Sequence, residues 1–382
     1  MLGTRICLAA TGLLLAAVAH AQAPAADPAA IVRVAESIPP TTLDPQQSTL
    51  GADWQAWQLA YECLLTTDAA GSIQPRLAAR YSESADHLSY DFALQPNAMF
   101  HNGQQVTAED VLYSFERLRD RGVPLLRGRF YPSLQKVEAI GPATVRFTLA
   151  GPDPSFLRNM ASPGVAGCAI ISRSVPEESL AQAMVGTGPY RQTGYTANQQ
   201  LELAAFDRYY GTRAANGGLR VHYIPDGLTQ LAGARAGQID LFFPAPALLR
   251  TLSQERGLKL ESAVLDYIDA IAINSAKPPF DNVQVRRAIA LAINRAAIVN
   301  TVYSGAAVPT SYLPPRLAWA PKVEDSPYGR RDIARAKALL AEAGFPNGFS
   351  ARLMHLTDRV EDAAQAAVIQ SQLATIGITV TI

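Results

Sequence analysis

The chain has 382 residues, of which 48% are hydrophobic, and its 33 basic and 33 acidic side chains give a formal net charge of zero. Balanced charge with scattered basic residues argues against nucleic acid or an anionic membrane surface as partner. The length exceeds what one hydrophobic core usually serves, so two or more lobes are expected.

The first 21 residues have the pattern of a cleavable export signal. Arg5 supplies a basic start, an apolar run follows at 8–19, and Ala19-His20-Ala21 matches a cleavage site. The apolar run is shorter than the roughly 20 residues that a membrane-spanning helix needs. We therefore predict a signal peptide over residues 1–21 and a soluble, periplasmic mature chain that begins at Gln22.

Two cysteines, Cys63 and Cys168, remain after removal of this signal. In an oxidising compartment they can form one disulfide, which requires Cα atoms within about 7 Å of each other. Two unpaired, buried thiols are the alternative, and at this point both stay open.

The first half of the mature chain has the signals of a mixed α/β lobe. Alternating apolar residues predict strands at 88–94 and 145–149. Between them, Thr107 predicts the start of a helix, and Arg117 falls in its last turn, where the helix dipole favours cations. Gly122 lies just beyond the predicted end of this helix.

After Tyr267 the pattern changes to long helices. Asp281 with Gln284 resembles a capping box that opens one helix, and Asn294 and Asp332 predict the starts of two more. Further elements are predicted as strands at 201–206 and 238–243, a helix at 360–375 and a strand at 378–382.

The sequence lacks the common signatures of catalytic and metal sites, including G-x-S-x-G, H-E-x-x-H and C-x-x-C. Gly186-Thr187-Gly188 begins like a dinucleotide-binding loop, but Arg191 occupies the third glycine position. The four histidines of the mature chain are too scattered to indicate a metal site. We therefore expect no enzyme, no metal and no cofactor.

Longer sequence strings extend over essentially the whole mature chain. They are LDP at 43–45, YECLL at 61–65, QPRLA at 74–78, FHNG at 100–103, VTAEDV at 106–111, GTGPY at 186–190, DRYY at 207–210, GQID at 237–240 and PFD at 279–281. In their order and spacing they resemble the family 5 extracellular solute-binding proteins, the oligopeptide, dipeptide and nickel-chelate binding proteins of bacterial ABC importers.

The resemblance implies an α/β periplasmic-binding-protein clamp of the cluster C type, with two main lobes and an extra inserted lobe. Lobe I would comprise residues 28–59 and 186–265, lobe II residues 60–185, and lobe III residues 266–382. Family members continue beyond the strand that matches 378–382, and in peptide-binding relatives that stretch carries the acidic residue that pairs with the α-amino group of the ligand. A truncated member with an incomplete third lobe is therefore expected.

The function that the resemblance implies is that of a substrate-binding component of an ABC transporter. It would be a monomer that captures oligopeptides or dipeptides and delivers them to the permease subunits. The same fold could instead bind a nickel or other metal chelate, haem or a glycoside. A periplasmic hydrolase is the less favoured alternative, because no nucleophile and base are found.

Ligand contacts are expected where the chain matches ligand-lining segments of relatives or offers cations and aromatic rings. Gly186 and Gly188 are candidates for a hinge, since glycine tolerates changes in φ and ψ, with a plain tight turn as the alternative. The expected ligand-binding residues are Thr49, Leu50, Gly51, Arg127, Arg129, Phe130, Tyr131, Tyr267 and Asn274.

Overall fold

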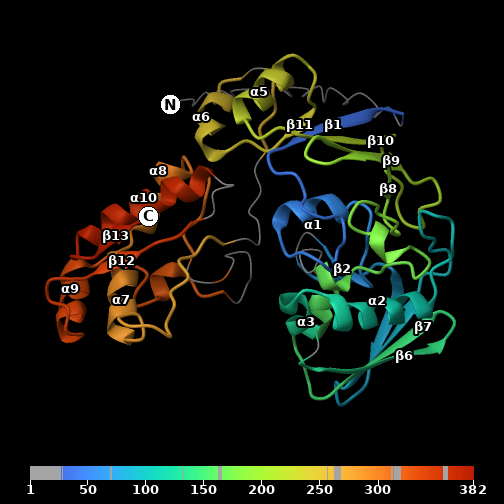
Figure 1. Ribbon diagram of the computed structural model, residues 1–382, viewed down its shortest axis with the longest axis horizontal. Helices are drawn as coiled ribbons and strands as arrows, with labels where there is room; N and C mark the ends of the chain where they lie inside the picture. The colour runs from blue at the N-terminus through green and yellow to red at the C-terminus, as the bar shows by residue number, and fades with distance from the viewer. Residues whose placement is uncertain are drawn as a thin grey trace, which may run out of the picture.

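The computed structural model describes residues 27, 29–68, 71–130, 132–161, 166–255, 257–261, 268–310, 313, 320–355 and 360–382. The predicted signal peptide and the candidates Tyr131 and Tyr267 lie outside these residues. We keep the names lobe I, lobe II and lobe III for the segments with the boundaries predicted above. Lobes I and II lie against each other, and lobe III lies to one side of them (Figure 1).

Lobe I is built on a five-stranded sheet with the strand order β11-β1-β10-β9-β8. β1 (Ile31–Glu36) is parallel to β10 (Gly218–Tyr223) and to β11 (Leu241–Phe242), whereas β9 (Gln200–Ala205) and β8 (Tyr190–Thr196) continue the sheet antiparallel. The sheet joins two segments that lobe II separates in the sequence. β11 is shorter than the strand predicted at 238–243. The helical elements of lobe I are α1 (Gly51–Trp57), α5 (Gly227–Arg235), η3 (Pro246–Leu248) and α6 (Leu249–Leu252).

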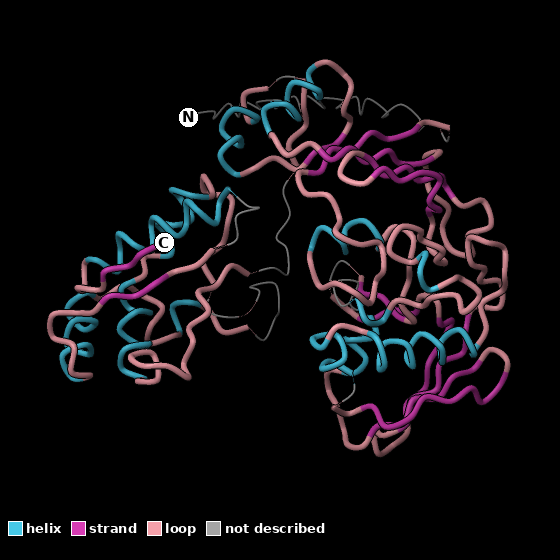
Figure 2. The backbone as a smooth tube through the Cα atoms, viewed as in Figure 1, coloured by secondary structure: helices cyan, strands magenta, loops and turns pink. Residues whose placement is uncertain are grey.

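Lobe II contains a four-stranded antiparallel sheet with the order β4-β5-β7-β6, one face of which is covered by α2 (Ala108–Arg121) (Figure 2). The ring of Phe115 in α2 meets that of Phe147 edge to face, with 4.9 Å between their centroids. The strands at 89–94 and 144–149 and the helix that follows Thr107 confirm the predictions. The remaining elements are β2 (Leu65–Thr67), β3 (Ile73–Pro75), β4 (Ala78–Glu83), β5 (Ser89–Leu94), α3 (Pro124–Phe130), β6 (Leu134–Gly141), β7 (Thr144–Leu149), α4 (Phe156–Ala161), η1 (Ala166–Cys168) and η2 (Glu177–Ser179).

Lobe III is mostly helical. The side chain of Asn294 accepts a hydrogen bond from Ala297 N at the start of α8, and that of Asp332 accepts one from Arg335 N at the start of α9, as predicted. The prediction for α7 was wrong by one position, because Asn282, another good capping residue, caps this helix in place of Asp281. The elements are α7 (Val283–Ala292), α8 (Arg295–Val302), η4 (Val323–Asp325), α9 (Ile333–Glu342), α10 (Val360–Ala374) and the parallel strands β12 (Ser350–Arg352) and β13 (Thr379–Thr381).

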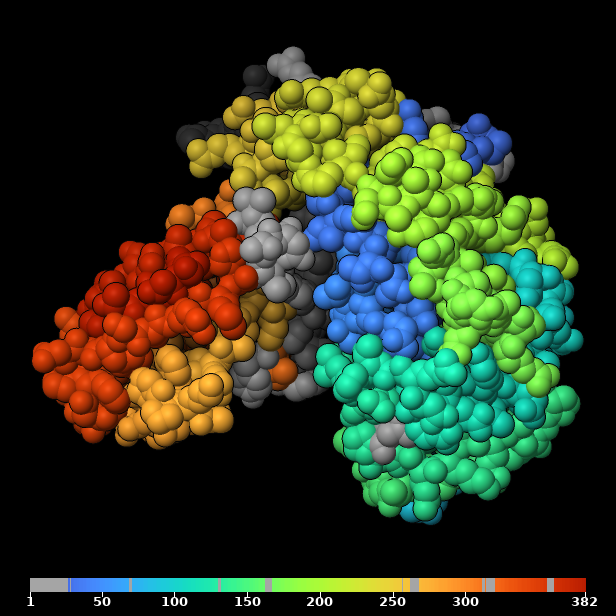
Figure 3. All heavy atoms as spheres, in the orientation of Figure 1, coloured from blue at the N-terminus to red at the C-terminus, as the bar shows by residue number. Residues whose placement is uncertain are grey.

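Buried apolar side chains form two separate cores in the described part of the chain. One core runs without interruption from Val34 in lobe I to Phe92 and Phe147 in lobe II. The other lies within lobe III, where α7, α9 and α10 pack around residues such as Leu339. Lobes I and II therefore form one packed body, and the surface is hollowed between this body and lobe III (Figure 3).

Candidate functional site

The first predicted ligand-binding segment lies exposed at the start of α1. Thr49, Leu50 and Gly51 are all exposed, and 53% of Leu50 is accessible to solvent. Beneath them Asp53 is fully buried, and its Oδ2 accepts a hydrogen bond from Thr41 Oγ1 at 2.8 Å. This buried bond fixes the helix whose first residues face solvent.

The second predicted segment lies in α3 and is tied to the first through Gln46. The backbone N–H of Val123, just before α3, donates to Gln46 O at 3.1 Å. In α3 itself, Arg127 is partly exposed, but its Nε is buried and has no hydrogen-bond partner in the described part of the chain. Arg129 accepts a hydrogen bond at its carbonyl oxygen from Asn159. The structure thus brings the two segments to one body, on the side where α1 and α3 are seen in Figure 1.

An ionic network around Arg117 positions the loop that leads into α1. The Arg117 guanidinium donates to both oxygens of Asp44, at 2.6 and 3.1 Å, and to Gln46 Oε1 at 2.9 Å. Its Nε donates to Glu177 at 3.0 Å. Only 5% of the Arg117 side chain is exposed, so it is a buried anchor. The prediction that it falls in the last turn of α2 was wrong, because the helix continues to Arg121 and the basic residues of its last turn are Arg119 and Arg121.

The crossover from lobe II back to lobe I packs tightly on the chain that leaves lobe I. A Cβ atom added to Gly186 would lie 2.0 Å from Ala60 O, and one added to Gly188 would lie 2.9 Å from the same atom. Neither glycine has a positive φ. The two glycines are therefore required for close backbone approach, and their role as a hinge stays a prediction.

His101 and Glu62 hold this crossover with hydrogen bonds. His101 Nε2 lies 3.0 Å from Gly188 O, and its Nδ1 accepts from Gly186 N at 3.3 Å. The imidazole is thus satisfied as the neutral Nε2–H tautomer, and burial lowers the pKa of His101 below its ordinary value. Glu62 Oε2 accepts from Thr187 Oγ1 at 3.0 Å. The sequence strings contain both side chains but do not indicate that both bind the crossover.

Cys63 and Cys168 form a disulfide, with their Cα atoms 5.1 Å apart and a separation of 105 positions in the sequence. The distance lies inside the 7 Å limit set above. The bond joins the beginning of lobe II to η1, near its end. It also lies next to Glu62, so that a covalent link and the crossover network share one region.

Of the remaining predicted contacts, Asn274 lies in lobe III, outside the body that holds α1 and α3. It is exposed, and its Oδ1 accepts a hydrogen bond from Ala276 N. For Phe130 the structure describes only the backbone position in α3. The prediction that these residues and the α1 segment contact one ligand therefore remains a prediction.

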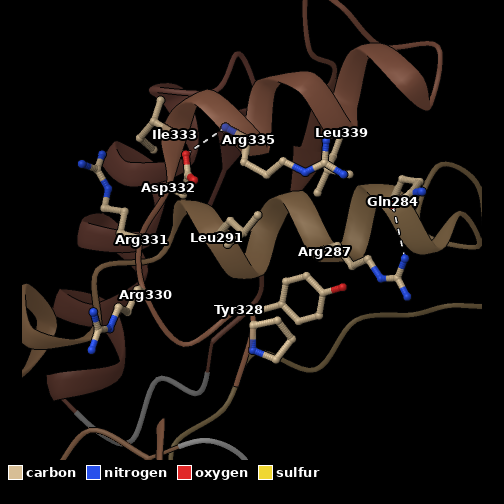
Figure 4. Close-up of a pocket in the computed structure, with 11 residues that line it drawn as sticks. Gln284, Arg287, Leu291, Tyr328, Arg330, Arg331, Asp332, Ile333, Arg335 and Leu339 are labelled. Atoms are coloured by element: carbon tan, nitrogen blue, oxygen red, sulfur yellow. Dashed lines mark hydrogen bonds between the residues drawn. The ribbon is translucent and has the colours of Figure 1, made fainter. Parts of the chain in front are cut away.

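One pocket among the described residues lies in lobe III and has a volume of about 670 Å³ (Figure 4). It opens between α7 and α9 and is lined by several arginines together with Tyr328. None of the predicted ligand-binding residues lines it. Within the described ranges we find no group of three or more histidine, cysteine, aspartate or glutamate side chains placed to hold a metal ion, and no helix long and apolar enough to cross a membrane.

An α/β body with a further lobe set apart from it is the architecture of a periplasmic-binding-protein clamp. Comparison with known proteins agrees: residues 72–382 match the profile of the bacterial extracellular solute-binding proteins, family 5 Middle. The chain belongs to this family, which consists of solute-binding proteins and not of enzymes.

Individual relatives are named for different ligands. The chain is 34% identical to heme-binding protein A of Haemophilus influenzae over 72% of its own length and 55% of that protein. It is 29% identical to the glutathione-binding protein GsiB of Escherichia coli K12, over 88% of the chain and 66% of that protein. The chain thus spans between about half and two thirds of the length of these relatives.

Among solved structures, the chain resembles the periplasmic binding protein DppA of Helicobacter pylori in complex with the peptide STSA. The TM-score is 0.81 at 27% sequence identity, over 93% of this chain and 73% of that one.

Proposed function

We propose that this protein is the periplasmic substrate-binding component of an ABC importer and that it captures short peptides. Membership of family 5 supports the first part. The second part is supported by the similarity to a peptide-bound structure and by the exposed segment at the start of α1. A periplasmic location and delivery to a membrane permease belong to the same proposal.

The observation that carries peptide capture is the exposed segment 49–51, which lies on the same body as Arg127, whose Nε is buried and has no partner among the described residues. Thr49 makes no hydrogen bond within the described residues, so its backbone groups are open to a ligand. An extended peptide can pair with such a segment through its own backbone, which gives affinity that depends little on side chains. Arg127 offers a charged donor for a carboxylate.

Two other ligand classes follow from relatives. Heme-binding protein A and the glutathione-binding protein are named for haem and glutathione, and glutathione is itself a modified tripeptide with two free carboxylates. A pocket for haem would need a large apolar surface. The exposed Leu50 contributes to such a surface, so haem is kept as the second candidate.

The test is calorimetric titration of the purified chain with a tripeptide mixture, glutathione and haemin in separate experiments. We expect binding of the tripeptides, weakened at least fivefold by Leu50→Ser and by Arg127→Gln. We call residues 49–51 of the α1 segment and Arg127 of α3 the ligand wall. Leu228→Ser is the matched control, because Leu228 is also an exposed leucine (63%) but lies in α5, outside the ligand wall. Binding of haemin alone would replace the peptide assignment, and equal effects of both leucine variants would contradict the proposed wall.

A further inference from the structure

The pocket in lobe III, here called the α7–α9 groove, carries an excess of positive charge. Four arginines line it: Arg287 from α7, Arg330 and Arg331 from the loop before α9, and Arg335 from α9 itself. The only carboxylate in its lining is that of Asp332. Because the whole chain has no net charge, this local excess is a property of the groove and not of a generally basic protein.

The single carboxylate is already engaged in the helix cap. Asp332 Oδ1 accepts from Arg335 N at 2.9 Å, so it caps α9 (Figure 4). The Arg335 side chain pairs with Glu342 at 3.1 Å, but both side chains are about half exposed, and a pair of that kind contributes little. Arg330 has neither a hydrogen-bond nor an ionic partner within the described part of the chain. Most of the positive charge is therefore available to an anionic partner.

Two of the guanidinium groups are held in place by neutral neighbours. The Arg287 guanidinium lies over the ring of Tyr328, 5.7 Å from its centroid, and its Nη1 is 3.5 Å from Gln284 Oε1. Arg331 donates through Nε to Ala292 O at 3.2 Å and through Nη2 to Thr375 Oγ1 at 3.4 Å. Side chains fixed in this way lose less rotamer freedom when they bind, which favours affinity.

The arrangement suits an extended anion better than a compact one. In Figure 4, Arg330 and Arg331 project at one end of the groove and Arg287 and Arg335 at the other, with Tyr328 between them. An extended anion, which carries several charges along its length, can meet guanidinium groups at both ends of the groove. The floor is closed, since Leu291 and Leu339 are almost fully buried, so a partner would contact the guanidiniums and the Tyr328 ring. Arginine and tyrosine are among the side chains enriched where proteins bind proteins.

We propose that the α7–α9 groove is a docking surface for an acidic, extended segment of a partner protein. The inference rests on the proposed function, in which a solute-binding protein must meet its permease, and it assigns the groove to that contact. Carboxylates of the partner would pair with the arginines at the two ends, and the chain between them would cross Tyr328. The groove is distinct from the ligand wall formed by α1 and α3.

The experiment titrates the 382-residue chain into a fluorescein-labelled decapeptide of alternating glutamate and glycine and follows anisotropy. We expect saturable binding that weakens as salt rises from about 0.05 to 0.2 M, since exposed charges are screened over that range. The pair of charge reversals Arg330→Glu and Arg335→Glu should weaken binding at least tenfold. Arg250→Glu is the matched control, because this exposed arginine lies in α6 of lobe I.

Several outcomes would overturn the proposal. One is equal affinity of the charge-reversal variant and the Arg250→Glu control for the decapeptide. A second is displacement of the decapeptide by inorganic phosphate at equimolar concentration. A third is tighter binding of the chain to vesicles of anionic lipid than to the decapeptide. Tripeptide titration on the same variants separates this inference from the proposed function. If the unmodified chain binds tripeptides but not the acidic decapeptide, only the docking role of the groove is rejected. If the unmodified chain does not bind tripeptides, the proposed function is rejected. Circular dichroism of each variant verifies folding.

Discussion

The phenolic oxygen of Tyr209 lies 2.7 Å from Glu62 Oε1 and donates a hydrogen bond to it, although 147 positions separate the two residues. The Tyr210 hydroxyl donates to the other carboxylate oxygen at 2.8 Å, and Arg76 Nε donates to Oε1 at 2.6 Å. Only 4% of the Glu62 side chain is exposed. One buried carboxylate therefore joins a cation of lobe II to two tyrosines of lobe I.

Replacing Glu62 should destabilise the junction between lobes I and II. Glu62→Ala leaves Arg76 and two phenols without their acceptor, and breaking a buried ionic pair costs about 3–5 kcal/mol. Arg76 is 40% exposed and can be hydrated, so we expect a loss of about 2–4 kcal/mol in chemical denaturation. Glu116→Gln, at an exposed position of α2, should change stability by less than about 0.5 kcal/mol. Similar losses in both variants would contradict the assigned role.

Gly186→Ala should be severely destabilising, because the new Cβ would lie 2.0 Å from Ala60 O and the backbone would have to move. Overpacking of this kind costs about 1–3 kcal/mol or more. Gly151→Ala is the control, since nothing lies within 4 Å of its added Cβ. Thermal unfolding of both variants decides the matter, and an unchanged midpoint for Gly186→Ala would show that the crossover is not tightly packed.

Reduction of the Cys63–Cys168 bond should lower the unfolding midpoint. A crosslink of this span restricts the unfolded chain, and native disulfides contribute about 2–4 kcal/mol. We expect a reducing agent to lower the stability of the natural chain and to leave the double variant Cys63→Ala, Cys168→Ala unaffected. If the reductant acts equally on both proteins, its effect does not come from this disulfide.

Stability should also fall as pH rises from about 4.5 to 7, through Glu36. This residue ends β1 beside Tyr223, and burial raises its pKa from 4.5 to about 7. In that window the native state retains a proton that the unfolded chain has lost, so unfolding becomes easier as pH increases. Glu36→Gln should remove this dependence and stabilise the protein by about 1–3 kcal/mol above pH 7. Denaturant titrations at pH 5 and 8 measure the change in the free energy of unfolding, with Glu324→Gln, at an exposed position, as the control. If both variants show the same change with pH, Glu36 is not its source.

Local signals in the sequence predicted local structure well. Thr107, Asn294 and Asp332 were recognised as helix starts because a cap depends on residues within one turn. Asp281 and the observed cap, Asn282, are adjacent and both residue types cap helices, so the sequence pattern does not distinguish them. The family strings predict the lobe boundaries and a ligand-binding segment that contains Leu50. The structure shows that Leu50 is exposed, and both the boundaries and the ligand contact stay predictions.

Contacts between residues that are far apart in the sequence could not be predicted from local patterns. Arg117 pairs with Asp44 across 73 positions, and no pattern in the helix itself distinguishes a buried arginine from a solvated one. The α7–α9 groove was missed for a similar reason, because Arg287 and Arg330 are brought together only when two helices pack. The adjacent Arg330 and Arg331 were the one available signal.

The disulfide also determines what a protease can do to this molecule. Every peptide bond between Cys63 and Cys168 belongs to a covalently closed ring that contains most of lobe II. A single cut in any surface turn of that ring therefore yields two polypeptides that remain attached to each other. The nicked protein would migrate as one species in a denaturing gel without reductant and separate into two fragments with it.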